Sequence, residues 1–80
     1  MTSFKNLVFI THPITKGIMA KYRFNSGKVL SIVAGEHLYS TPNTPVYSED
    51  SVTAFEVMFD EEVFGWQTRE DINRIFIENN

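Results

Sequence analysis

Residues 18–34 carry the pattern that most constrains the fold, because they predict two strands joined by a tight turn. Apolar and polar side chains alternate from Ile18 to Phe24, as expected for a strand with one buried face. Asn25-Ser26-Gly27 follows, and Gly27 can take the left-handed conformation that closes a three-residue hairpin loop. Residues 28–34 then form the returning strand. The predicted cross-strand pairs are Tyr22 with Leu30, Ala20 with Ile32, and Lys21 with Ser31.

Two segments around this hairpin are predicted to add short strands. Residues 4–10 are rich in aromatic and branched side chains and end at Thr11-His12-Pro13, where proline disfavours a helix. Residues 37–39 are predicted as a second short strand. Residues 41–45 contain two prolines, which remove donors from a strand ladder, so this segment should be an exposed loop.

Residues 52–59 fit two patterns. As a strand, they place alternate side chains from Thr53 to Phe59 on one face; as a helix, they begin an apolar stripe that runs from Val52 to Val63. The β-branched and aromatic content favours the strand, and the helix stays open as an alternative. In the strand model an acidic turn spans residues 60–62, and the expected pairs are Phe64 with Phe59 and Trp66 with Val57.

The C-terminal residues predict a helix. Thr68 can cap its free N–H groups, and Glu70 and Asp71 stand at the positive end of the helix dipole in a capping-box pattern. Apolar side chains then recur at helical spacing and should pack on the sheet; they are Ile72, Ile75 and Phe76. The predicted fold class is α+β: an antiparallel sheet of four to five strands, with a barrel-like curl as a variant, packed by a C-terminal α-helix.

Size and composition limit the organisation and the location of the chain. The 80 residues predict a single domain over 1–80, with a modest core. The absence of cysteine excludes disulfides and thiolate metal sites and fits a reducing compartment. The apolar run Leu7 to Ile10 is too short for a signal peptide. We therefore expect a cytoplasmic protein without a membrane-spanning segment.

Charges are sorted along the chain. Residues 1–35 contain five basic side chains and no acid, whereas residues 36–80 contain all ten acids and two arginines, so the halves carry +5 and −8 of the net charge of −3. This asymmetry indicates electrostatic recognition. A patch of acids within fourteen residues is the first candidate site, with Trp66 as an aromatic anchor; the acids are Glu49, Asp50, Glu56, Asp60, Glu61 and Glu62. Such a patch would bind a protein with a basic surface, unless these acids only maintain solubility or neutralise the basic half.

The alternative site is a basic surface on the first hairpin, formed by Lys21, Arg23 and Lys28. Cationic grooves with exposed aromatic rings bind single-stranded nucleic acid. However, Tyr22 and Phe24 alternate with the cations and should face the core, and strand cations also protect sheet edges. Nucleic acid is therefore a disfavoured partner.

Catalytic and cofactor signatures are missing from the sequence. His12 and His37 are the only imidazoles, and no spacing unites them with carboxylates as a metal site requires. There is no Cys nucleophile, no Gly-x-Ser-x-Gly elbow and no glycine-rich phosphate loop. We expect no enzyme activity, no cofactor and no metal.

Two segments are similar to small uncharacterised phage and prophage proteins. Residues 22–35 combine an aromatic-rich strand, an Asn-Gly-type turn with Ser26 inserted, and an apolar strand ending in glycine. Residues 63–72 resemble the ending of those proteins, an apolar-x-Gly-aromatic step into a capped helix. The resemblance implies a viral or prophage accessory protein and transfers no catalytic residue.

The resulting hypothesis is a non-enzymatic inhibitor that occludes a host nucleic-acid-handling or defence protein through the acidic surface, in the host cytoplasm. Two alternatives remain open. One is a homo-oligomeric structural or virion-associated module, for which a dimer would suffice. The other is a small-ligand or nucleic-acid binder that uses the basic hairpin.

Overall fold

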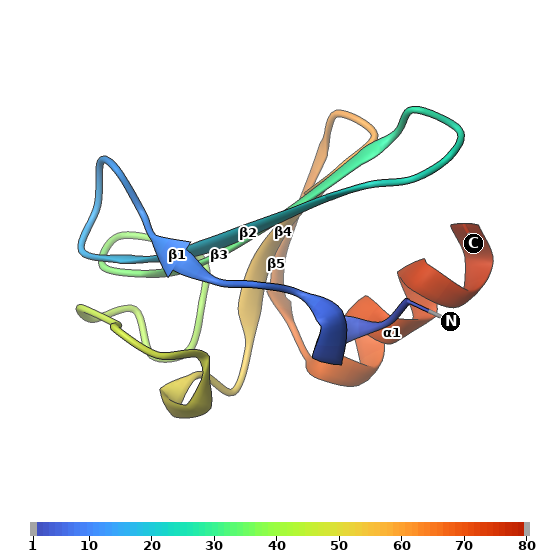
Figure 1. Cartoon of the computed structure of the whole chain (residues 1–80). Coiled ribbons are helices and arrows are strands. Elements are labelled where there is room, and N and C mark those ends of the chain that lie inside the picture. Colours follow the sequence, from blue (N-terminus) through green and yellow to red (C-terminus); the bar gives the residue numbers. More distant parts are fainter. Residues whose placement is uncertain (1, 80) are drawn as a thin grey trace.

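A computed structural model describes residues 2–79 and shows an antiparallel sheet with a helix packed on one face (Figure 1). The elements in chain order are η1 (Phe4–Asn6), β1 (Ile10–Thr11), β2 (Gly17–Arg23), β3 (Val29–Gly35), η2 (Glu49–Ser51), β4 (Phe55–Phe59), β5 (Glu62–Gln67) and α1 (Arg69–Asn79). The five strands lie in the order β1-β2-β3-β4-β5, and every neighbouring pair is antiparallel. The predicted α+β class is confirmed, and the sheet does not close into a barrel.

The β2–β3 hairpin forms as predicted. Tyr22 pairs with Leu30, Ala20 with Ile32, and Lys21 with Ser31. Gly27 has φ 94°, the left-handed conformation that the short loop requires. Turn length and alternation act on neighbouring residues, so this hairpin is determined locally.

The strand prediction for residues 52–59 is confirmed over Phe55–Phe59, whereas residues 52–54 precede the strand. The predicted pairing with β5 is shifted by two residues. Phe64 lies opposite Val57 instead of Phe59, and Phe59 pairs with Glu62. The turn is shorter than predicted because Asp60 and Glu61 both adopt positive φ, 52° and 67°, as in a two-residue type I′ turn.

A bulge interrupts the same pair of strands near Trp66. The register shifts between Phe55 and Val57, so Trp66 does not pair with Val57 as predicted. Trp66 has φ 53°, and its N–H donates to the Tyr39 carbonyl at 3.0 Å. The extra residue turns the Trp66 side chain out of the strand alternation.

The predicted strand over residues 4–10 is wrong except at its end. Residues 4–6 form the single turn η1, and pairing with β2 begins only at Ile10. Aromatic packing explains the difference: Phe9 stacks on Phe55 and Phe4 packs against it at a tilt, with ring centroids 5.7 and 5.3 Å from that of Phe55. The Phe4 N–H also donates to Asn73 Oδ1 of α1 at 2.8 Å, so this segment covers the core instead of extending the sheet.

The predicted strand at residues 37–39 is also wrong. The chain turns here, and His37 has φ 67°, which is incompatible with a strand. A single bridge between Thr41 and Ala54 is the nearest pairing. Residues 41–45 form the predicted loop, exposed except for the half-buried Pro42.

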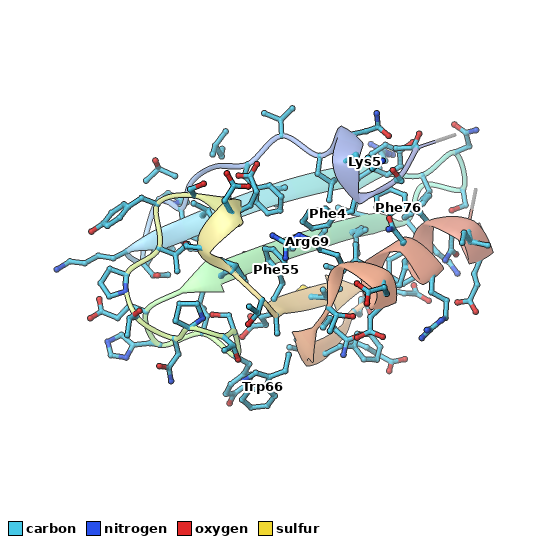
Figure 2. All side chains as sticks on the ribbon, turned by 90° about the horizontal axis from the view of Figure 1, so that it is seen from below. Phe4, Lys5, Phe55, Trp66, Arg69 and Phe76 are labelled. Atoms are coloured by element: carbon cyan, nitrogen blue, oxygen red, sulfur yellow. The ribbon has the colours of Figure 1, made fainter. Side chains whose placement is uncertain are left out.

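The core lies between the inner face of the sheet and α1 (Figure 2). Ile72 and Phe76 of α1 are buried as predicted, and Ile75 is half-buried. Phe76 contacts Tyr22 and Phe24, with ring centroids at 5.1 and 5.5 Å. A small chain thus obtains buried area from large rings.

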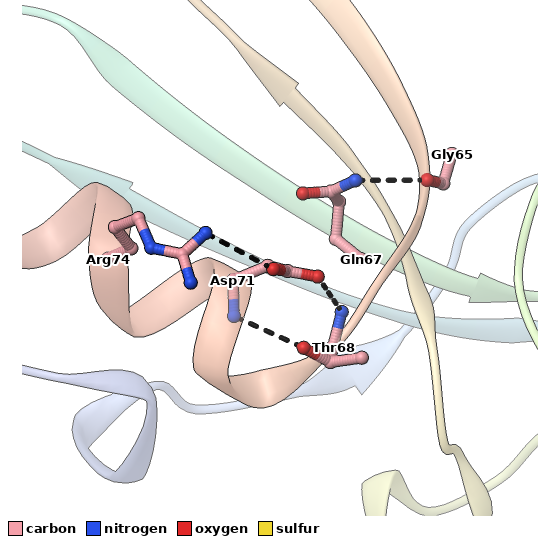
Figure 3. A network of polar contacts seen from close by, with 5 residues as sticks. All are labelled: Gly65, Gln67, Thr68, Asp71 and Arg74. Carbon is pink, nitrogen blue, oxygen red and sulfur yellow. Dashed lines mark hydrogen bonds and ion pairs between the residues drawn. The ribbon is translucent and has the colours of Figure 1, made fainter.

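The predicted capping box opens α1 (Figure 3). The Thr68 N–H donates to Asp71 Oδ2 at 2.9 Å, and the Asp71 N–H donates to Thr68 Oγ1 at 3.2 Å. Arg74 Nη1 approaches Asp71 Oδ1 at 3.5 Å. Hydrogen bonds from the Thr68 backbone and side chain, assisted by Arg74, hold the pKa of Asp71 below its ordinary value of 3.8.

This lowered pKa predicts an acid-sensitive contribution to stability. The folded state favours the ionised form of the Asp71 carboxylate. The stabilisation that this carboxylate provides is therefore complete above pH 3.8 and is lost as the pH falls through the folded-state pKa. We therefore expect the stability advantage of the wild type over Asp71→Asn to shrink on acidification. Urea unfolding between about pH 6 and pH 2 would measure it. Glu70→Gln is the control, and an advantage that stays constant with pH would contradict this assignment.

Candidate functional site

One face of the sheet has no helix over it within residues 2–79 (Figure 1). Strand alternation sends the core side chains toward α1 and the intervening side chains to the opposite surface. We call this surface the outer face; it is formed by Met19, Lys21, Arg23, Val29, Ser31, Val33, Glu56, Met58 and Val63.

The outer face contains a shallow concavity of about 650 Å³. Met19, Val33 and Met58 line it from β2, β3 and β4, and Leu38 adds an apolar side chain from the loop after β3. Met58 remains 50% exposed and Val29 44%. The solvated side of an antiparallel sheet usually carries mainly polar side chains, so five apolar residues among these nine make the outer face a candidate contact surface.

Five of the predicted site residues meet at this concavity, although they come from both predicted surfaces. Lys21 and Lys28 belong to the basic hairpin, whereas Glu56, Asp60 and Glu61 belong to the acidic set. Lys28 Nζ lies 3.6 Å from Asp60 Oδ2 and links the tips of the two hairpins. The structure therefore joins parts of two separate predictions into one mixed-charge surface.

The six acids do not form one contiguous patch. Glu49 and Asp50 lie on η2, at the other end of the molecule from the β4–β5 turn that carries Asp60 and Glu61 (Figure 1). Glu62 pairs with Phe59, so its side chain points to the helix side of the sheet. The fold thus separates acids that lie close together in the sequence.

Trp66 lies apart from the concavity. Its ring packs on Tyr39 with a centroid distance of 5.3 Å, and 59% of the residue is exposed (Figure 2). Tyr39 is held in place because its N–H donates to Glu56 Oε1 at 3.1 Å. Glu56 therefore connects the concavity to the loop that supports Trp66.

The basic hairpin does not present aromatic rings beside its cations. Phe24 is buried, and Tyr22 packs edge-on against Phe24 and Phe76 at 5.0 and 5.1 Å. The Tyr22 hydroxyl donates to Thr2 Oγ1 at 3.2 Å. Base stacking on these two rings is unavailable, which further disfavours the nucleic-acid alternative.

The sequence reasoning missed the apolar side chains of the outer face. Met19, Val33 and Met58 occupy strand positions where alternation predicts polar residues, and this mismatch was the available signal. Leu38 was missed for another reason, since only the folded loop brings it to the sheet. Neither the predicted acidic patch nor the predicted basic surface indicated by itself that the outer face would be the candidate site.

Comparison of the chain with protein-family models, curated proteins and solved structures gave no significant match. In the part of the chain that the structure describes, no helix is long and apolar enough to cross a membrane. Residues 2–79 also contain no group of three or more His, Asp or Glu side chains placed to hold a metal ion.

Proposed function

We propose that this chain is a non-enzymatic protein-binding module that contacts its partner through the concavity of the outer face. The observation that carries the proposal is the uncovered apolar floor bordered by charges of both signs. Apolar centres surrounded by polar rims are typical of protein interfaces. Such a module acts by covering the surface of the protein chain that it contacts.

The mixed charge favours a protein over a nucleic acid as the partner. A nucleic acid requires a continuous positive surface, whereas Glu56, Asp60 and Glu61 border the same concavity as Lys21 and Lys28. A protein surface can present both charge signs around an apolar group. Occlusion through acids alone has less support, because Glu49 and Asp50 lie far from the β4–β5 turn.

Panning of a random-peptide display library on sparsely immobilised protein tests this proposal. We expect peptides selected by the wild type to lose at least about tenfold in affinity for Met58→Lys, because the substitution puts a charge on the apolar floor. Ile77→Lys is the matched control, since Ile77 is an exposed apolar residue of α1 on the opposite side, 66% accessible. Peptides that bind both variants equally well would overturn the proposal.

A further inference from the structure

We propose that the partner of the outer face is a second copy of this chain, related to the first by a two-fold axis parallel to β3. This inference rests on the proposed function, because it names the occupant of the same face. It follows from the way in which the charges on the outer face are distributed across the strands.

The charges divide on either side of β3. Lys21 and Arg23 lie on β2 and Lys28 lies in the β2–β3 turn, whereas Glu56 lies on β4 and Asp60 and Glu61 form the β4–β5 turn. β3 separates β2 from β4 in the sheet and contributes Val29, Ser31 and Val33 to the outer face. The surface thus has a basic side, an uncharged middle and an acidic side.

Rotation about an axis parallel to β3 makes this surface complementary to itself. When two outer faces meet across such an axis, β2 of one copy lies over β4 of the other, and the basic side covers the acidic side. Rotation about an axis perpendicular to the strands would place β2 over β2 and bring like charges together. Two-fold interfaces are self-complementary, so the charge pattern selects the first arrangement.

Positions along the strands agree with this arrangement. Lys28 and Asp60 lie at neighbouring hairpin tips, as their 3.6 Å ion pair shows. A rotation about β3 keeps these tips at the same end, so Lys28 of one copy approaches Asp60 and Glu61 of the other. Lys21, Ser31 and Met58 share one row across the sheet, so Lys21 of one copy approaches Met58 of the other.

The apolar side chains suit contact between two sheets. Sheets pack face to face about 10 Å apart through interdigitated side chains. Met19 and Met58 are unbranched and can adjust to fill the shallow concavity where two curved sheets meet. The contact would cover Val29, Val33 and Met58, which the single chain leaves partly accessible.

Sedimentation equilibrium over rising protein concentration tests the proposal. We expect the mass to rise toward twice the 9.2 kDa of one chain. Met58→Lys should raise the dissociation constant at least about tenfold, because it places a cation opposite Lys21 of the other copy. Ile77→Lys should leave the constant unchanged. Circular dichroism would verify that both variants stay folded.

A charge-swap pair tests the direction of the axis. Lys21→Glu with Lys28→Glu makes an acidic outer face, and Asp60→Lys with Glu61→Lys makes a basic one. Each variant alone should be monomeric, whereas their equimolar mixture should restore a dimer of unequal chains. Restoration would support the arrangement, and a mixture that remains monomeric would overturn it.

Two results would separate this inference from the proposed function. A wild-type chain that is monomeric at every concentration, but whose selected peptides depend on Met58, would overturn the dimer and leave the binding function. A dimer that Met58→Lys does not weaken would overturn the assignment of the interface. Failure of the peptide test as well would remove the proposed function.

Discussion

Replacement of Arg69 by alanine is expected to lower the free energy of unfolding by about 3 kcal/mol. Arg69 Nη1 donates to the Val52 carbonyl and Nη2 to the Glu49 carbonyl, both at 2.7 Å. Hydrogen bonds from a charged donor contribute about 1.5–3 kcal/mol each, and part of this is offset because the side chain is only half-buried. For 80 residues with a total stability of about 4–12 kcal/mol, the loss would be a large fraction.

Aromatic contacts add to this effect. The Arg69 guanidinium lies 5.1 Å from the centroid of the Phe4 ring and 5.2 Å from that of Phe55 (Figure 2). One side chain thus connects the start of α1 with η1, β4 and the segment that contains η2. Removal of Arg69 should loosen the packing of α1 against all three of these parts of the chain together, because the same side chain contacts each of them.

Urea unfolding of three variants would check this prediction. Arg74→Ala is the matched control, because Arg74 lies on the same helix and is exposed, with one surface contact to Asp71. It should change the midpoint little. Arg69→Lys should recover only part of the loss, since an ammonium lacks the planar fork that reaches two carbonyls. Equal effects of Arg69→Ala and Arg74→Ala would contradict the role given to Arg69.

Replacement of Gly17 by alanine is expected to destabilise the fold by about 3 kcal/mol or more. Gly17 and Gly35 lie opposite each other in the β2–β3 pair. A Cβ on Gly17 would overlap the Ala34 carbonyl, and a Cβ on Gly35 would lie 2.6 Å from Gly17 Cα. Both clashes involve backbone atoms, so no side chain can move to relieve them.

The backbone around this pair is also held from both sides. The Gly17 carbonyl accepts from the His12 N–H at 2.8 Å, and the neighbouring Lys16 carbonyl accepts from the Val46 N–H at 3.1 Å. A shift of β2 would break these bonds, so relaxation is costly. Gly35→Ala should be at least as harmful, because Gly35 also has φ 149°.

Thermal unfolding with Gly27→Ala as the control would test the prediction. Gly27 also has positive φ, at 94°, but an added Cβ meets no atom within 4 Å. Its substitution should cost only the strain of the backbone conformation, about 1 kcal/mol. If Gly17→Ala unfolded at the same temperature as Gly27→Ala, this result would contradict the prediction. It would show that the close approach of β2 and β3 at Gly17 does not exclude a Cβ.

The parts of the fold that were predicted correctly depend on neighbouring residues. Alternation from Ile18 to Phe24 and the loop at 25–27 set the β2–β3 register, because both signals lie within one hairpin. Thr68 and Asp71 set the start of α1 through bonds that span three residues. Such local signals are complete in the sequence.

The errors arose where distant residues compete with local preference. Residues 4–9 have strand-like composition, but aromatic packing against Phe55 and the hydrogen bond to Asn73 decide their course. The β4–β5 register was missed because two acids adopt the left-handed conformation that glycine or asparagine usually takes. Nothing near Arg69 in the sequence indicated that it would bind the carbonyls of residues 49 and 52.

The same division holds for the candidate site. The sequence by itself determined the class of the fold, the first hairpin, the helix cap and the unequal distribution of charge along the chain. Only the tertiary structure decided that Lys21 and Lys28 share a surface with Glu56, Asp60 and Glu61. The physical reason is that pairing of β3 with β4 joins segments more than twenty residues apart, so a charge pattern in the chain becomes a surface only when the sheet forms.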